Sequence, residues 1–182
     1  KNKTFRGKQL DKYPLYIIGA DFNLEAQQTS LKNLINNNID CIILEGDISN
    51  PEKFNKNLNN KYGLNLNELL NVRSFLDHNR IFKPNLNNNL KKSMSTGAYA
   101  YRGELIKNIT LEQNLLEHLQ AWKPYVNKYG LLILELHCLD PKVISNNIGL
   151  TASTAYESTH GYSDQYIVNL ECFLNLAKKS GL

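Results

Sequence analysis

Apolar residues along the chain alternate between short continuous runs and stripes at helical spacing. Continuous runs are typical of strands buried on both faces of a sheet, and the stripes are typical of amphipathic helices. Strands are therefore predicted over residues 15–20, 41–45, 72–76 and 131–136. Helices are predicted over residues 24–38, 51–62, 110–129 and 164–180.

Capping residues mark most of these helix boundaries. Side-chain acceptors are favoured just before a helix, proline in its first turn and glycine just after its end. Thr110 and Gln113 have the spacing of a capping box. The other predicted boundary residues are Asn23, Asn50 with Pro51, Gly63, Gly130, Ser163 and Gly181.

Residues 79–109 show no clear period. Long segments of this kind in compact domains are usually functional or mobile, so we interpret this one as a lid or insertion. Tyr99 and Tyr101 lie in it and are expected to close over a site and exclude water.

Strands that alternate with helices predict an α/β fold with a parallel sheet and right-handed crossovers. Ligands of such sheets bind outside the carboxyl ends of the strands. Polar and ionisable side chains gather at these predicted ends, namely Asp21, Asn23, Asp47, Asp77, His78 and His137. The sequence thus places a binding site there.

Composition narrows the class of protein. The length of 182 residues suits one domain, and no apolar run is long enough for a membrane span. The basic residues behind the net charge of +4 are scattered, except for Lys1, Lys3, Arg6, Lys8 and Lys12, which argues against a dedicated nucleic-acid binder. Cys41, Cys138 and Cys172 are odd in number and lie in apolar segments, so free thiols in a reducing, cytoplasmic setting are expected.

Asp21 and Asp47 follow consecutive predicted strands. Carboxylates at such positions can accept hydrogen bonds from ribose hydroxyls and an adenine amino group, although each can instead cap the next helix. The ten glycines contain no G-x-G pair, and the chain begins without methionine. We expect a preceding strand and its glycine-rich loop to be missing from this chain.

Three of the four histidines, His78, His137 and His160, lie where chemistry is expected. His118 falls within a predicted helix and is interpreted as a surface or packing residue. No compact ligand pattern such as H-E-x-x-H occurs, so spacing alone leaves both a metal site and structural histidines open.

Four segments together resemble the AprA-related methyltransferases of polyketide assembly lines. They are residues 19–23 (GADFN), 72–80 (VRSFLDHNR), 134–139 (LELHCL) and 160–165 (HGYSDQ). The resemblance implies a Rossmann-like class I methyltransferase sheet in three α/β/α layers. Residues 1–182 would then form a single partial domain that lacks the first strand and the last strands of the sheet.

The resemblance also implies the activity. Family members use S-adenosylmethionine and a mononuclear Fe²⁺ or Mn²⁺ site to methylate the α-carbon of a malonyl unit on an acyl carrier protein. By this likeness His137, His160 and Gln165 are the predicted metal ligands, and Asp77 and His78 are the catalytic or neighbouring groups. The predicted cofactor-binding residues are Asp21, Phe22, Asn23, Asp47 and Ile48.

The expected partners are an acyl carrier protein or neighbouring synthase domains, and a small acyl substrate. The departures at both ends predict that this polypeptide alone binds the cofactor poorly. Two other functions stay open: a metal-independent methyltransferase of a small molecule, in which His137 and His160 are structural or act as bases, and a degenerate scaffold domain.

Overall fold

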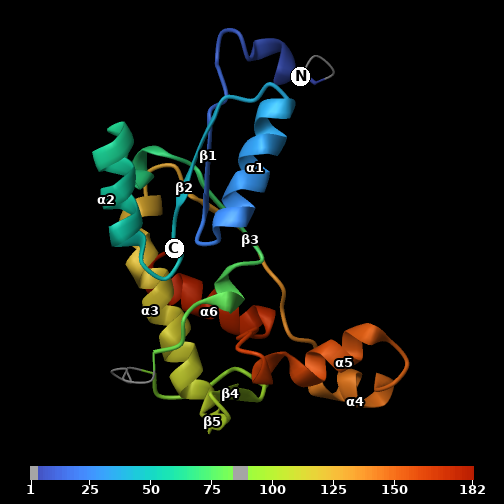
Figure 1. Ribbon diagram of the computed structural model, residues 1–182. Coiled ribbons are helices and arrows are strands. Elements are labelled where there is room, and N and C mark those ends of the chain that lie inside the picture. Colours follow the sequence, from blue (N-terminus) through green and yellow to red (C-terminus); the bar gives the residue numbers. More distant parts are fainter. Residues whose placement is uncertain (1–3, 84–89) are drawn as a thin grey trace. The chain divides into compact units, whose positions relative to one another are not determined.

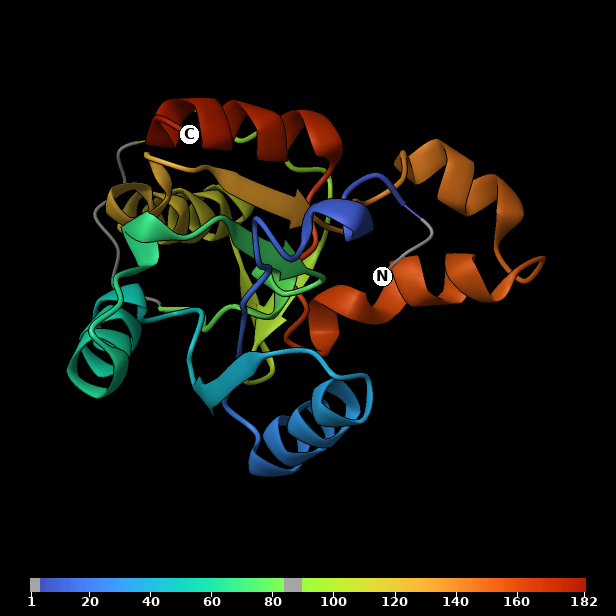
Figure 2. The ribbon, with the colours of Figure 1, turned by 90° about the horizontal axis from the view of Figure 1, so that it is seen from above.

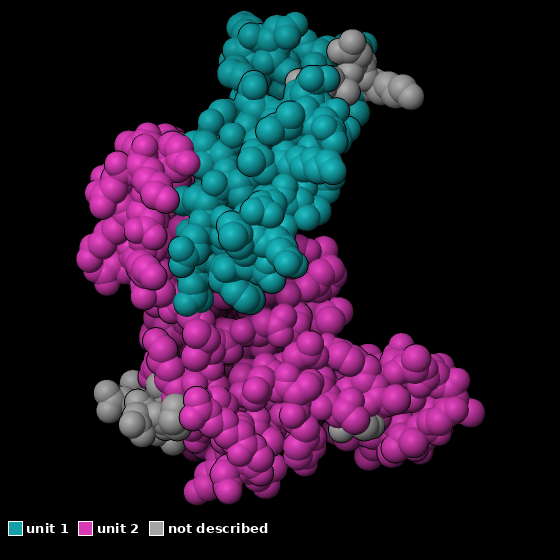
Figure 3. All heavy atoms as spheres, viewed as in Figure 1, with its two compact units in different colours: residues 1–47 teal, residues 48–182 magenta. Residues whose placement is uncertain are grey.

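The computed structural model describes residues 4–83 and 90–182, apart from the side chain at position 158. These residues divide into two compact units, residues 1–47 and 48–182, which Figure 3 colours separately. Each unit is described by itself. The single domain expected over 1–182 stays a prediction, as does the implied three-layer sheet. Lys1 and Lys3 of the basic N-terminal cluster lie outside the described residues.

Residues 1–47 form a strand–helix–strand unit (Figure 1). After the short 3₁₀ turn Gly7–Gln9 come β1 (Ile17–Asp21), α1 (Leu24–Asn36) and β2 (Cys41–Glu45). The strands are parallel, with Ile17 opposite Cys41 and Asp21 opposite Glu45. The predicted cap is confirmed, because the Asn23 side chain accepts the N–H groups of Glu25 and Ala26 at 2.8 and 3.2 Å.

These two strands are less buried than predicted. Leu44 is their one residue in the buried class, and most of the others are half-buried. The prediction of strands buried on both faces is therefore wrong here. The reason is that α1 is the one helix described in this unit, and none of its own residues is fully buried.

The larger unit begins with α2 (Pro51–Tyr62). Its predicted ends are confirmed: the Asn50 side chain accepts the N–H of Lys53 at 3.0 Å, and Gly63 closes the helix at φ 67°. Only glycine adopts this left-handed conformation without strain. The 3₁₀ turn Leu66–Glu68 then leads into β3 (Asn71–Ser74), which ends in a second 3₁₀ turn, Asp77–Asn79.

β3 pairs in parallel with β6 (Leu131–Leu134), from Asn71 opposite Leu131 to Ser74 opposite Leu134. Parallel pairing is thus confirmed within each unit. The burial of β6 alternates, and Leu132 and Leu134 are more than half exposed. β6 is therefore not the doubly buried strand that its continuous apolar run predicts, because only alternate residues such as Ile133 pack on the core.

Regular structure also occurs in the predicted lid. β4 (Tyr99–Tyr101) and β5 (Glu104–Ile106) form an antiparallel hairpin. Tyr99 is fully buried, and its hydroxyl donates to the Ile167 carbonyl at 2.6 Å. The expectation that Tyr99 moves to cover a site is therefore wrong, since this side chain belongs to the core. Residues 84–89 of the predicted lid lie outside the described residues.

α3 (Asn108–Val126) begins earlier than predicted. The Thr110 N–H already donates to the Lys107 carbonyl at 2.9 Å, so Thr110 lies inside the first turn and the predicted capping box is wrong. Two helices, α4 (Pro141–Asn147) and α5 (Ala152–Thr159), were not predicted, and the 3₁₀ turn His160–Tyr162 follows them.

The last helix, α6 (Leu170–Ser180), begins after Asn169 rather than at the predicted cap Ser163. Residues 166–168 are instead buried outside any helix or strand, and the Val168 carbonyl accepts the N–H of Cys138 at 3.1 Å. This long-range pairing overrides the helical spacing of the segment. Gly181 ends α6 at φ 85°, as predicted.

α3 and α6 pack against each other beside β6 and form the main core of the larger unit (Figure 2). The buried members of this core are Phe82, Leu90, Tyr99, Leu111, Leu115, Leu116, Leu119, Tyr166, Val168, Cys172, Phe173 and Leu176. Among the described helices, none has the length and apolar character needed to cross a membrane.

Glu112 on α3 is buried and holds the chain that enters the hairpin. One carboxylate oxygen accepts hydrogen bonds from the Ser93 hydroxyl and from the N–H groups of Met94 and Ser95, at 2.6–2.8 Å. Replacement Glu112→Ala leaves three donors without this acceptor. We expect it to lower the free energy of unfolding by about 2–4 kcal/mol, measured by urea denaturation. The control is Glu104→Ala on the exposed β5, and an equal effect of both would contradict the assignment.

Candidate functional site

The carboxyl ends of β3 and β6 lie at the same edge of their sheet because the strands are parallel and in register. Asp77 and His78 are the third and fourth residues after β3, and β6 leads directly into Glu135. The positive φ of Phe75, 56°, turns the backbone out of β3 toward this edge. The predicted clustering of ionisable groups at a strand edge is thus present in the larger unit.

His78 and Glu135 form a close, buried pair. The His78 Nδ1 lies 2.6 Å from one Glu135 carboxylate oxygen, and the His78 backbone N–H donates to the other at 3.1 Å. Both side chains are at most 5% exposed. Burial acts to raise the pKa of Glu135, but hydrogen bonds from His78 and the Leu136 N–H outweigh it and leave this pKa below its usual value. Glu135 is therefore a carboxylate that orients the imidazole.

Asp77 lies beside this pair in a separate ionic network. Its carboxylate contacts the His118 Nε2 at 3.0 Å and the Arg73 guanidinium at 3.3 Å. Burial acts to raise the pKa of Asp77, and these two partners outweigh it and lower the pKa. Burial lowers the pKa of His118, although its contact with Asp77 acts in the opposite direction. His118 is thus a buried polar partner of Asp77, and the interpretation of it as a surface or packing residue missed this contact.

Arg73 extends the network to Trp122. The guanidinium carbon lies 4.7 Å from the centroid of the Trp122 ring, within the range of a cation–π contact. The Trp122 Nε1–H donates to the Ile48 carbonyl at 2.8 Å. Ile48, one of the predicted cofactor-binding residues, is therefore held in place by a side chain of α3.

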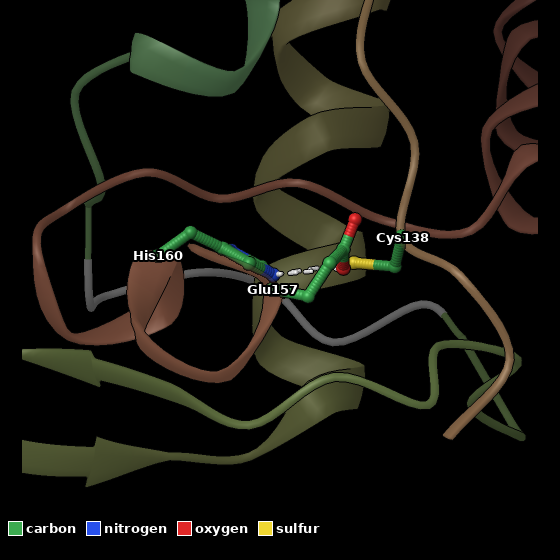
Figure 4. A group of neighbouring side chains, drawn as sticks. All are labelled: Cys138, Glu157 and His160. Carbon is green, nitrogen blue, oxygen red and sulfur yellow. Dashed lines mark hydrogen bonds and ion pairs between the residues drawn. The ribbon is translucent and has the colours of Figure 1, made fainter. Parts of the chain in front are cut away.

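His160 belongs to a third group, with Cys138 and Glu157, which Figure 4 shows. The His160 Nε2 lies 3.4 Å from the Cys138 sulfur and 3.8 Å from a Glu157 carboxylate oxygen. The Cys138 thiol also donates to the Ile167 carbonyl at 2.9 Å. Burial raises the pKa of this thiol to about 12, so it is protonated at neutral pH.

The close packing at Gly161 fixes the position of His160. Gly161 lies against the Ala98 carbonyl so tightly that a Cβ atom would overlap it. The His160 Nδ1 lies 3.0 Å from the Gln165 carbonyl oxygen, which only accepts, so Nδ1 carries the proton. The lone pair of His160 is therefore on Nε2, toward Cys138 and Glu157.

The other two predicted metal ligands have different partners. The Gln165 side-chain oxygen accepts the Tyr156 hydroxyl at 2.8 Å. The His137 Nδ1 lies 3.3 Å from the Val168 carbonyl, and its ring packs edge-on against Phe173. The group of closely spaced His, Cys, Asp and Glu ligand atoms found among the described residues includes His160 but not His137. The convergence of His137, His160 and Gln165 stays a prediction.

A pocket of about 410 Å³ lies next to this group. Its lining residues are Leu136, His137, Ala152, Ser153, Tyr156 and Glu157. Glu157 thus belongs both to the pocket wall and to the group with His160. α5, which the sequence did not predict, forms one side of the pocket.

The remaining predicted cofactor residues belong to the smaller unit. The Asp21 carboxylate accepts the N–H of Asn23 at 2.8 Å, so it stabilises the turn into α1. Phe22 is 82% exposed. Asp47 is the last residue of this unit. Asn23 is the residue that caps α1, and Asp21 supports the turn before this cap. The contact of Asp21 with a ribose stays a prediction.

Sequence reasoning missed Glu135, Cys138 and Glu157. Glu135 was counted as part of an apolar strand, although an acidic residue in such a run is itself a signal. Cys138 was interpreted only as a buried thiol. Glu157 lies in a helix that the sequence analysis interpreted as a polar loop. The spacing of three residues between Glu157 and His160 therefore did not indicate that the two side chains are neighbours.

Comparisons with known proteins address the family. The family model described as the AprA MT2-like domain matches residues 1–182. A comparison with curated proteins returns no match. The model spans the chain from its first residue to its last, and it confirms the resemblance carried by the four segments. The chain therefore belongs to the AprA MT2-like family of methyltransferases.

Proposed function

We propose that this protein is an S-adenosylmethionine-dependent C-methyltransferase that acts on the α-carbon of a malonyl-type acyl group held on an acyl carrier protein. Family membership supports methyl transfer. The observation that supports carbon as the acceptor is the buried His78–Glu135 pair. A carbon acid must lose a proton before it attacks a methyl group, so such an enzyme needs a positioned base.

His78 has the features of that base. Glu135 accepts the Nδ1 proton, which leaves the lone pair on Nε2 to take the α-proton of the substrate. The imidazolium formed in this step is stabilised by the adjacent carboxylate, as in other histidine–carboxylate pairs. The substrate carbon then attacks the methyl carbon as the bond from that methyl to sulfur breaks.

Asp77 acts indirectly in this proposal. Its carboxylate is engaged by Arg73 and His118, so it holds the turn that carries His78 instead of contacting substrate. S-adenosylmethionine supplies the methyl group as a sulfonium. Trp122 holds the Ile48 carbonyl and thereby orients the loop predicted to meet the adenine.

A divalent metal, when bound, stabilises the enolate of a 1,3-dicarbonyl unit as a Lewis acid. The donors described around His160 are compatible with such an ion, because their ligand atoms all lie within 4.8 Å of one another. Glu157 extends from this group into the wall of the pocket, where an acyl group has room to bind.

Removal of the base tests carbon methylation directly. We expect His78→Ala and Glu135→Gln to lower kcat about 10²–10⁴-fold, and to slow deuterium exchange at the substrate α-carbon in the absence of S-adenosylmethionine. The exchange is followed by NMR on a malonyl-loaded carrier protein. The matched control is Glu104→Gln on the exposed β5. If both variants keep wild-type exchange while methylation falls, His78 is not the base.

Trp122→Phe tests the orientation of the cofactor loop. Loss of the hydrogen bond to Ile48 costs about 0.5–1.5 kcal/mol, which corresponds to a roughly 2–12-fold rise in the Kd for S-adenosylmethionine. We expect KM for the cofactor to rise with little change in kcat, as measured by calorimetry and initial rates. Tyr129→Phe, in the turn after α3 where the side chain is exposed, is the control. An unchanged Kd would contradict this role, and absence of cofactor binding by the full-length wild-type protein would favour a scaffold domain.

Metal removal separates the proposed enzyme from a metal-independent one. We expect purified full-length protein to contain close to one divalent ion per chain by elemental analysis. Chelation should abolish methyl transfer, and re-addition of Fe²⁺ or Mn²⁺ should restore it. A protein with no bound ion and with activity that survives chelation would leave a metal-independent methyltransferase as the function.

A further inference from the structure

We infer that Cys138, Glu157 and His160 form a divalent-cation site, and that its sulfur ligand selects a borderline-soft ion such as Zn²⁺ or Fe²⁺ over Mn²⁺. The inference deepens the proposed function, since the ion would face the acyl pocket. It assigns a ligand set that differs from His137, His160 and Gln165, and it rests on positions of described side chains (Figure 4).

The spacing of the ligand atoms matches a small tetrahedral site. Bonds of 2.0–2.3 Å at tetrahedral angles separate neighbouring ligand atoms by roughly 3.4–3.6 Å. The His160 Nε2 lies 3.4 Å from the Cys138 sulfur and 3.8 Å from the Glu157 oxygen. The sulfur and that oxygen lie within 4.8 Å of each other, so a small rotation of Glu157 completes the geometry.

The imidazole is already oriented as metal-bound histidines are. Such histidines donate their second ring N–H to a carbonyl or carboxylate, which fixes the tautomer. His160 does so through Nδ1, 3.0 Å from the Gln165 carbonyl. Gln165 therefore takes part through its backbone, while its side chain accepts from Tyr156.

Cys138 is held on the opposite side of the site. Its backbone N–H donates to the Val168 carbonyl, and its thiol lies 2.9 Å from the Ile167 carbonyl. Metal binding replaces the S–H bond with an S–metal bond, and the proton passes to solvent. The three ligands come from the segment after β6, from α5 and from the turn that follows it, so they assemble only in the folded unit.

One position of the ion stays open to a substrate oxygen. Three protein ligands plus one exchangeable position are the usual arrangement of a catalytic zinc site. Glu157 lines the 410 Å³ pocket together with Tyr156 and His137. His137 is thus a pocket residue and not a ligand in this assignment. A thiolate ligand suits zinc and iron, whereas manganese prefers oxygen ligands.

Cobalt substitution tests the assignment. We expect Co²⁺, titrated into metal-free full-length protein, to produce a near-ultraviolet sulfur-to-cobalt charge-transfer band together with visible bands of tetrahedral cobalt. Cys138→Ser should abolish the near-ultraviolet band. Glu157→Gln and His160→Ala should weaken Co²⁺ binding by at least the roughly 10–100-fold that follows loss of a supporting contact.

The controls separate the two ligand sets. His137→Ala, Gln165→Ala and Cys41→Ser should retain the band, and circular dichroism checks that each variant is folded. The assignment is overturned if Co²⁺ does not bind, if it binds without a sulfur band, or if the band survives Cys138→Ser.

Methyl transfer is measured separately from cobalt binding. A protein that methylates its substrate but lacks the band keeps the proposed function and loses this site. A protein that shows the band but neither binds S-adenosylmethionine nor transfers methyl keeps the site and loses the proposed function.

Discussion

The buried carboxylate of Asp77 is a constraint on which much of the larger unit depends. A charge in this position is costly unless it is paired and hydrogen-bonded, and Arg73 and His118 supply those contacts from β3 and α3. Asp77 also lies in the turn that carries His78. The requirement to neutralise one carboxylate therefore joins a strand, a helix and the edge of the sheet where the site lies.

The same network connects the turn that carries the proposed base His78 with the loop predicted to bind the cofactor. Arg73 lies between Asp77 and Trp122, and Trp122 binds the backbone of the loop that begins with Ile48. The Arg73 Nε and one terminal nitrogen, like the second Asp77 oxygen, lack a hydrogen-bond partner in the described part of the chain. The stacking of the guanidinium on the indole thus contributes to holding Arg73. Loss of this contact would affect the positions of both Asp77 and Trp122.

Capping residues in the sequence predicted helix boundaries well where the cap contacts only neighbouring residues. Asn23, Asn50 and Gly63 act on neighbouring backbone groups, and each was assigned correctly from the sequence. Ser163 failed as a cap because residues 166–168 pair with Cys138 across the unit, which no local pattern reveals. The strand ranges were nearly right, but their burial was overestimated, since covering layers depend on which elements pack on each face.

The candidate site shows the same limit. Strand-end position singled out His78 as a candidate, and the family likeness singled out His160, whereas their contacts with Glu135, Glu157 and Cys138 depend on tertiary packing. His78 and Glu135 are far apart in the chain and meet only because β3 and β6 are neighbours. Glu157 approaches His160 only because residues 152–159 are helical, which places positions three apart on the same face.

The contact of Gly161 with the Ala98 carbonyl has a consequence for sequence variation. A Cβ atom at position 161 would overlap this carbonyl, so any other residue there would push the turn that carries His160 away from the start of β4. The ring of His160 would move with that turn, away from Cys138 and Glu157. A single hydrogen atom in place of a side chain at position 161 therefore determines whether these three groups can meet.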